Sequence, residues 1–160
     1  MGLIRMLHEV KLIPERNLLE VYPPFLFMGV KVVYVSKNYR HIHIQLPLRW
    51  YGKNLYGTMF GGFICAVSDP LPALLCSKLF DGMQVWTKSQ KVEFLRPAKG
   101  ALDTHVRIST QDISMIKQAL KSDGEATHAF SFMFQDERGR EIAQVENTVF
   151  IRRKRERKSG

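Results

Sequence analysis

The alternation of hydrophobic and polar positions predicts most of the strands of this chain. Residues 41–46 (HIHIQL) alternate with a period of two, which is typical of a half-buried strand. The preceding run 25–36 (FLFMGVKVVYVS) is rich in β-branched and aromatic residues and predicts a strand paired with it. By the same criteria we expect four later strands, at residues 83–95, 101–110, 126–135 and 142–151.

The longest apolar run, residues 58–80, predicts a buried helix. It is longer than a strand, and a helix that is hydrophobic all round is a buried one. About twenty helical residues span roughly 30 Å, which matches a sheet of about six strands spaced roughly 4.8 Å apart. A shorter amphipathic helix is predicted at 112–121. Apolar residues at a rough helical period predict another at 3–13, and Pro23-Pro24 should end any helix that follows it.

The order of these elements predicts an α+β fold in a single domain. A helix is followed by two strands, the long buried helix and four more strands, so one sheet can bury one helix against its face. The length of 160 residues suits one domain. We expect an N-terminal helical segment at 1–24 packed on a domain at 25–153, followed by a basic tail at 154–160.

Charge narrows the choice of partners. The chain carries a formal net charge of +9, which suits a polyphosphate such as coenzyme A, an anionic membrane or nucleic acid. Much of the excess lies in residues 152–158 (RRKRERK). A solvated chain end explains this run, so nucleic acid is not the expected partner. Association of the tail with nucleic acid or membrane is the third class of function to be weighed.

The two cysteines indicate a reducing compartment. Cys65 and Cys76 are 11 residues apart, or about 16 Å along one helix, beyond the reach of a disulfide. We therefore expect small buried thiols and a cytoplasmic location. No signal peptide and no run of 18 apolar residues without charge is evident, so no transmembrane segment is expected.

The candidate chemistry lies at the start of the long helix. The first N–H groups of a helix lack acceptors and carry the positive end of its dipole, so those of Gly61 and Gly62 could stabilise an oxyanion. Asp69 is an acid within a very apolar helix, where burial should raise its pKa. Purely structural roles compete with these chemical ones. Asp69 before Pro70 is also a helix N-cap signature, and the glycines could serve only close helix–sheet packing.

The same residues carry a family resemblance. Residues 54–69 fit the pattern N-x-x-G-T-M-F-G-G-(x)6-D, which resembles the hotdog thioesterases, where a long buried helix is wrapped by a curved antiparallel sheet. A narrower group of thioesterase-like domains of unknown function is closer still. The shared motifs are GTMFGG at 57–62, DP at 69–70, VWTK at 85–88 and D-x-x-G-x-x-x-A-x-V-x-x-T-x-x-I-R at 136–152. The resemblance covers roughly residues 20–153, and Phe60 replaces the histidine of the broader pattern.

This resemblance implies a fatty-acyl-CoA thioesterase, with a non-catalytic acyl-binding protein as the alternative. Asp69 would be the nucleophile or general base, the N–H groups of Gly61 and Gly62 would hold the thioester oxygen, and Asn54 would position water or substrate. Around them we expect these substrate contacts: Thr58, Phe60, Tyr56, Lys88 and Lys91. Coenzyme A would enter as part of the substrate, and no metal or separate cofactor is implied.

Spacing along the helix argues for an oligomer. Gly61 and Asp69 are eight residues apart, about 12 Å along a straight helix, yet both must come within about 3 Å of one reacting group. They should therefore come from different subunits of a dimer, or of a dimer of dimers. His41 and His43 share a strand face and could bind a metal, although an exposed strand also explains them. No serine nucleophile elbow, P-loop or dinucleotide fingerprint is present.

Overall fold

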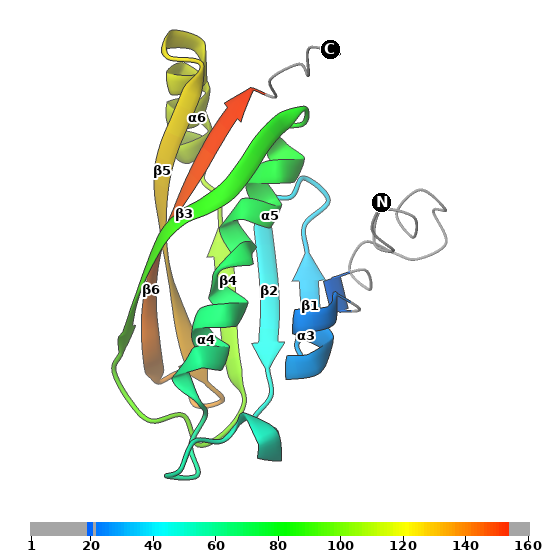
Figure 1. Cartoon of the computed structure of the whole chain (residues 1–160), viewed down its shortest axis with the longest axis vertical. Helices are drawn as coiled ribbons and strands as arrows, with labels where there is room; N and C mark the ends of the chain where they lie inside the picture. Colours follow the sequence, from blue (N-terminus) through cyan, green and yellow to red (C-terminus); the bar gives the residue numbers. More distant parts are fainter. Residues whose placement is uncertain (1–18, 21, 154–160) are drawn as a thin grey trace, which may run out of the picture.

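A single antiparallel sheet bends around one helical run in the computed structural model, which describes residues 19–20 and 22–153 (Figure 1). Six strands pair in the order β1-β2-β4-β5-β6-β3, every pair antiparallel. Their bounds are Lys31–Val35 (β1), His41–Leu46 (β2), Met83–Phe94 (β3), Leu102–Arg107 (β4), Glu125–Asp136 (β5) and Glu141–Arg153 (β6). The 12-residue strand β3 therefore forms one edge of the sheet.

The helices lie mostly on the concave side of this sheet. They are Pro23–Met28 (α3), Gly61–Ser68 (α4), Pro70–Leu79 (α5) and Thr110–Ser122 (α6), with a short 3-10 turn, η1, at Trp50–Gly52. Only Asp69 separates α4 from α5, and its backbone is helical, with φ −53° and ψ −55°. The two helices therefore run on as one long element across the sheet, as the sequence predicts (Figure 1).

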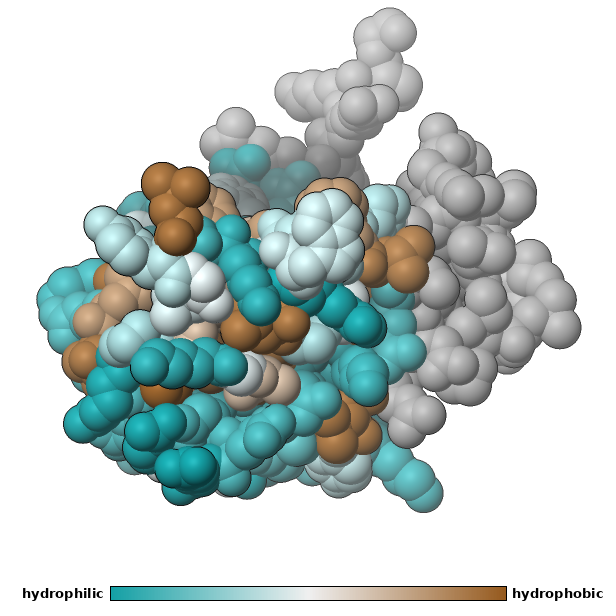
Figure 2. Space-filling model, turned by 90° about the horizontal axis from the view of Figure 1, so that it is seen from below, coloured by the Kyte–Doolittle hydropathy of each residue, from teal (hydrophilic) through white to brown (hydrophobic). Residues whose placement is uncertain are grey.

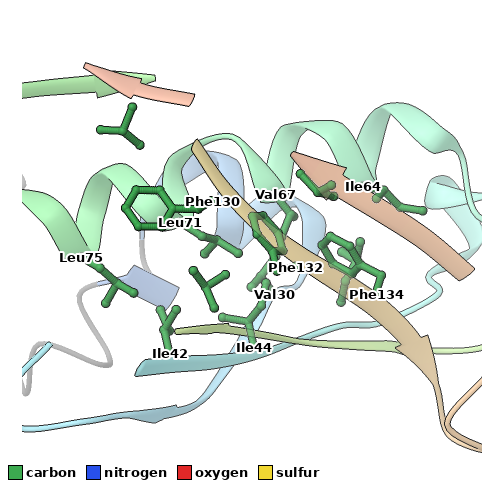
Figure 3. Close-up of a cluster of buried hydrophobic side chains, with 14 of the residues drawn as sticks. Val30, Ile42, Ile44, Ile64, Val67, Leu71, Leu75, Phe130, Phe132 and Phe134 are labelled. Atoms are coloured by element: carbon green, nitrogen blue, oxygen red, sulfur yellow. The ribbon is translucent and has the colours of Figure 1, made fainter. Parts of the chain in front are cut away.

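The core lies between this element and the sheet. One face of α4 and α5 points its apolar side chains toward β5, β2 and the residue before β1 (Figure 3). The facing residues are all buried: Ile64, Val67, Leu71 and Leu75 from the helices, and Val30, Ile42, Ile44, Phe130, Phe132 and Phe134 from the sheet side. Burial of these side chains, worth about 1.5–3 kcal/mol each, holds the helix against the sheet.

The predicted strand at 25–36 is wrong in its first half. Helical residues 19 and 20 end before Pro23, as expected, but Pro23 and Pro24 also occupy the first turn of a new helix, α3, where their missing N–H groups have no intrahelical role. Gly29, at φ 69°, closes α3 in the left-handed conformation, and the strand begins only at Lys31. The apolar composition of 25–28 serves α3, which buries Phe25 and Met28 on one face.

By length and composition alone, Gly61–Leu79 could cross a membrane. A core helix of the same length passes that test as well. Here the run packs against the concave face of the sheet through the residues of Figure 3, so the fold accounts for its apolar character. The expected N-terminal helix at 3–13 and the tail at 154–160 lie outside the described residues, and the segment boundaries at 24 and 153 remain predictions.

Candidate active site at the start of the long helix

The first turn of α4 offers free backbone donors. The N-cap residue Phe60 has an extended backbone and no side-chain hydrogen bond to the helix. The N–H of Phe63 returns to the carbonyl of Phe60 at 2.9 Å, whereas those of Gly61 and Gly62 precede the first possible intrahelical acceptor. Among the described residues nothing else accepts from them. This helix end is therefore suited to an oxyanion.

Two phenyl rings lie against the glycines. A Cβ atom on Gly61 would come within 2.9 Å of Phe94 Cζ at the end of β3, and one on Gly62 would overlap the ring of Phe60. A side chain at either position would force the neighbouring phenyl ring to shift, so glycine favours close packing here, which is one of the two roles that the sequence suggests for these residues. Since the N–H groups remain unpaired, the packing and oxyanion interpretations are compatible. Phe60 and Phe94 are half exposed and form an apolar wall beside the donors.

The loop before α4 is organised by Asn54. Its Nδ2 donates to Thr58 Oγ1 at 2.9 Å, and its Oδ1 accepts from the N–H groups of Tyr56 and Thr58 at 2.9 and 3.2 Å. The Asn54 amide is thus engaged within its own loop and supports the approach to Phe60. Thr58 is part of the same network, whereas the Tyr56 side chain is 90% exposed.

Asp69 is neither the buried acid nor the helix cap that the sequence predicts. Its side chain is exposed, so the burial that the sequence argument assumed is wrong. It makes no capping hydrogen bond, and its helical backbone angles are not those of an N-cap. No described residue pairs with its carboxylate. Asp69 therefore presents a free acid on the outward face of the long helix.

The backbone at Asp69 is held by side chains from the sheet. Pro70 and Pro72 lack N–H groups, so the helix loses the donors to the carbonyls four residues earlier, including that of Ser68. Asn147 Nδ2 donates to the carbonyls of Asp69 and Ser68 at 3.0 and 3.4 Å. Thr87 Oγ1 donates to the carbonyl of Asp69 at 2.7 Å. The prolines thus interrupt the hydrogen-bond ladder while the sheet supplies replacements.

Two of the supporting residues, Gln90 and Asn147, were not predicted from the sequence. Gln90 Nε2 donates to the Cys65 carbonyl at 3.1 Å and its Oε1 lies 3.2 Å from Ser68 Oγ. Asn147 is fully buried, and its Oδ1 has no hydrogen-bond partner. Both residues lie at helix-facing positions of β3 and β6, where alternation calls for apolar side chains. A polar residue at a strand position where alternation calls for an apolar one is the sequence signal that could have identified both residues.

The predicted lysine contacts are not brought to this site within one subunit. Lys88 Nζ lies 5.8 Å from the ring centroid of Phe150, on the outer face of the sheet. Lys91 pairs with Glu93 at 2.7 Å. Trp86 packs on Phe150 in the same outer layer, with ring centroids 4.7 Å apart. These side chains face away from Gly61 and Asp69 of their own chain.

The cysteines do not offer a nucleophile. Both thiols are free, and Cys76 is buried. Burial raises the pKa of Cys76 to about 12 and also raises the pKa of Cys65. Because the thiolate is the reactive form, both stay protonated at neutral pH. Asp69 is left as the candidate for base or nucleophile close to the helix start.

The histidines form pairs away from the helix. On the outer face of β2 and β4, His41 Nε2 lies 3.0 Å from His105 Nδ1, and His43 Nε2 lies 2.7 Å from Asp103 Oδ1. No group of three or more His, Cys, Asp or Glu side chains within residues 19–20 and 22–153 is arranged to hold a metal ion. His128, which the sequence left without a role, pairs with an acid in the first turn of α6.

A family model covers almost the whole described chain. Residues 13–151 match the domain of unknown function DUF4442. The chain belongs to this family. No curated protein sequence matches it.

Solved structures of thioesterase-like proteins share the fold. A protein of unknown function and probable thioesterase from Pseudomonas aeruginosa has a TM-score of 0.77 at 20% identity, over 88% of this chain and 96% of that one. A Haemophilus influenzae thioesterase has a TM-score of 0.69 at 13% identity, over 89% and 91%. A Staphylococcus aureus thioesterase is similar in a glutamine-to-alanine and a glutamate-to-alanine variant, with TM-scores of 0.62 and 0.63 at 16% identity, over 79% and 96%. The DUF4442 chain is a hotdog domain, as its resemblance implied.

Proposed function

We propose that this DUF4442 protein hydrolyses fatty-acyl thioesters at a site shared between two subunits. The observation that carries the proposal is that the long helix has two free groups: the glycine N–H groups at the start of α4, which lack an acceptor, and the carboxylate of Asp69. An oxyanion site and a base or nucleophile are the two parts that acyl transfer requires. The thioesterase-like fold makes a thioester the substrate class to test first.

The shared site follows from the helix. Gly61 and Asp69 lie about 12 Å apart along it, so one copy supplies the donors and another the acid. No described strand pairs with the outer edge of β3, so this edge can pair with a second β3. Thr87 of that strand holds the Asp69 backbone. Pairing two β3 edges would therefore bring the second helix close.

The residue spacing of a structural relative supports the choice of residues. In the Staphylococcus aureus thioesterase, the substituted glutamine and glutamate are 15 residues apart. Asn54 and Asp69 are also 15 residues apart. An amide residue and an acid therefore recur at equal separation in two chains of one fold. In this chain the Asn54 amide shapes the loop before the donors, and Asp69 supplies the acid.

The chemistry needs no group beyond water and the thioester. The N–H groups of Gly61 and Gly62 stabilise the oxyanion that forms when the carbonyl is attacked. Asp69 of the second copy accepts a proton from the attacking water, and the C–S bond breaks to release a thiolate, which is protonated, and the fatty acid. In the alternative route Asp69 attacks the carbonyl itself, the C–S bond breaks to release the thiolate, and water then cleaves the resulting acyl anhydride to free the fatty acid and Asp69. Coenzyme A is the proposed carrier, in a reducing, cytoplasmic compartment.

One matched pair of variants tests the oxyanion site. Gly61→Pro removes the first N–H group, and proline is tolerated at the first helical position because Phe60 already has an extended ψ of 122°. Gly61→Ala adds a Cβ atom against Phe94 but keeps the N–H group. Hydrolysis of acyl-CoA by Gly61→Pro should fall by roughly 100-fold or more relative to Gly61→Ala. Equal activities would exclude this N–H as a donor.

A non-catalytic acyl-binding protein is the second candidate. It is favoured by Phe60, which places a phenyl ring against Gly62 where the broader hotdog pattern has an imidazole. Calorimetry that shows acyl-CoA binding by wild type, with no hydrolysis at any chain length, would support it. Hydrolysis that depends on Asp69 would exclude it.

A further inference from the structure

We propose that the lower end of the molecule in Figure 1 docks on an anionic lipid surface. Five exposed side chains from α3 and the loop before α4 form what we call the basal surface: Leu26, Phe27, Trp50, Leu55 and Tyr56. Seen from below, hydrophobic and near-neutral side chains lie exposed there among hydrophilic ones (Figure 2). This proposal does not depend on the thioesterase chemistry.

The basal surface is one structure and not a set of scattered residues. The rings of Phe27 and Tyr51 lie 5.6 Å apart and join α3 to η1, and those of Trp50 and Tyr51 lie 5.5 Å apart within η1. The N–H of Met59 donates to the carbonyl of Ala98 at 2.9 Å, which ties the loop before α4 to the loop after β3. A connected base therefore supports the protruding side chains.

Exposure at the tip exceeds what packing requires. Trp50 is 83% exposed, Tyr56 is 90% exposed and Leu55 is fully exposed. Asn54 fixes the turn beneath Leu55 and Tyr56 through three hydrogen bonds. A rigid turn thus presents Leu55 and Tyr56, and η1 presents Trp50; amphipathic aromatic side chains of this kind favour the interface between lipid and water.

Within the segments that carry the basal surface the charge is of one sign, and an acidic residue beside them is Glu141, whose carbonyl accepts from Arg96 Nη1 at 2.6 Å. The segments 22–30, 47–60 and 94–101 contain no Asp or Glu. They contribute four exposed cations: Arg49, Lys53, Arg96 and Lys99. None of the four forms an ion pair with a described residue. Arg49, Lys53 and Lys99 can therefore face lipid phosphate, and an anionic surface attracts cations that lie close to it.

Lipid fits this surface better than a second copy or a nucleic acid. A second copy would bring four more cations against these four. Nucleic acid would match the charge but would leave the aliphatic Leu55 without an apolar environment. A bilayer interface accepts both features at once. Docking of this end also directs the start of α4 near Gly61 toward the membrane.

Tryptophan fluorescence tests the proposal directly. The chain has two tryptophans, Trp50 and Trp86, so Trp86→Phe leaves Trp50 as sole reporter. With vesicles of phosphatidylcholine and phosphatidylglycerol, its emission should shift to the blue and be quenched by brominated lipid. The Trp50→Phe variant, which reports Trp86 on the outer sheet face, should show neither change. A silent Trp50 overturns the proposal.

Co-sedimentation with the same vesicles measures the apolar and the electrostatic contributions to binding. Leu55→Asp should weaken binding roughly ten-fold or more and Met115→Asp, its control on α6, should not. Lys53→Ala should weaken it roughly five-fold at low salt and Lys117→Ala should not. Binding that survives Leu55→Asp, or that depends only on residues 154–160, would contradict the basal surface. A lower mass of lipid-free Leu55→Asp in light scattering would assign the surface to a second copy instead.

Discussion

At Asp69 a free side chain is combined with a firmly held backbone. The carboxylate is exposed and unpaired, whereas its carbonyl accepts from Asn147 and Thr87. We expect Asp69→Asn and Asp69→Ala each to change the free energy of unfolding by less than about 0.5 kcal/mol, because no buried contact or cap is lost. Hydrolysis should collapse in both. Denaturant unfolding and acyl-CoA assays check this, and a loss of about 1 kcal/mol in Asp69→Ala alone would restore the cap interpretation.

Asn147 has the opposite character, because it is buried and acts only through the backbone. Asn147→Leu removes the donor to the carbonyls of Ser68 and Asp69 and should destabilise the fold by roughly 1–3 kcal/mol. Thr87→Val should destabilise the fold less, because Asn147 still donates to the Asp69 carbonyl in that variant. Thermal unfolding followed by circular dichroism measures both. Unchanged stability in Asn147→Leu would show that the proline-interrupted turn needs no support.

Strands β2 and β4 bring His41 and His105 into contact, and this contact makes the stability of the fold depend on pH. The pKa of His41 is lowered by burial, by Arg107 and by His43. The pKa of His105 is lowered by burial, by His43, by Arg107 and by His41, and only Asp103 opposes this shift. Because the folded pKa values lie below the ordinary 6.5, the unfolded chain binds more protons as the pH falls through 6.5. This contribution to stability is present above that pH and is lost on acidification.

We therefore predict that the free energy of unfolding changes with pH more steeply in wild type than in a variant that lacks one of the two histidines. The free energy of unfolding should fall between about pH 7.5 and about pH 5.5, and less steeply in His105→Gln than in wild type. Urea unfolding at each pH measures the slope. Parallel curves for the two proteins would mean that the histidine pair does not contribute.

For the whole molecule, the shared site predicts complementation between inactive subunits. Gly61→Pro lacks a donor and Asp69→Asn lacks the acid, so each homodimer should be inactive. A mixed dimer holds one intact site, and random exchange at equal amounts should restore roughly a quarter of wild-type activity. A site within one chain predicts no recovery. Light scattering provides the control, since a strict monomer at micromolar concentration would exclude the shared site.

Much of this molecule was predictable from local patterns. Period-two alternation identified β2 and β5, because each buries one face on the helix, and the long apolar run identified α4 and α5. The motif at 54–69 located the glycines at the helix start and the acid beyond them. These features depend on residue order over short distances, which determines local geometry and which face is apolar.

Contacts between distant segments decided the rest. Residues 25–28 suit a strand or a helix by composition, and packing of Phe25 and Met28 on the core favours the short helix α3. The outward direction of Asp69 depends on which face of the helix meets the sheet. Its support from Asn147, 78 positions away, arises only when β6 pairs beside β3. Burial and long-range hydrogen bonding are properties of the folded chain, so the sequence alone placed the candidate acid but not its environment.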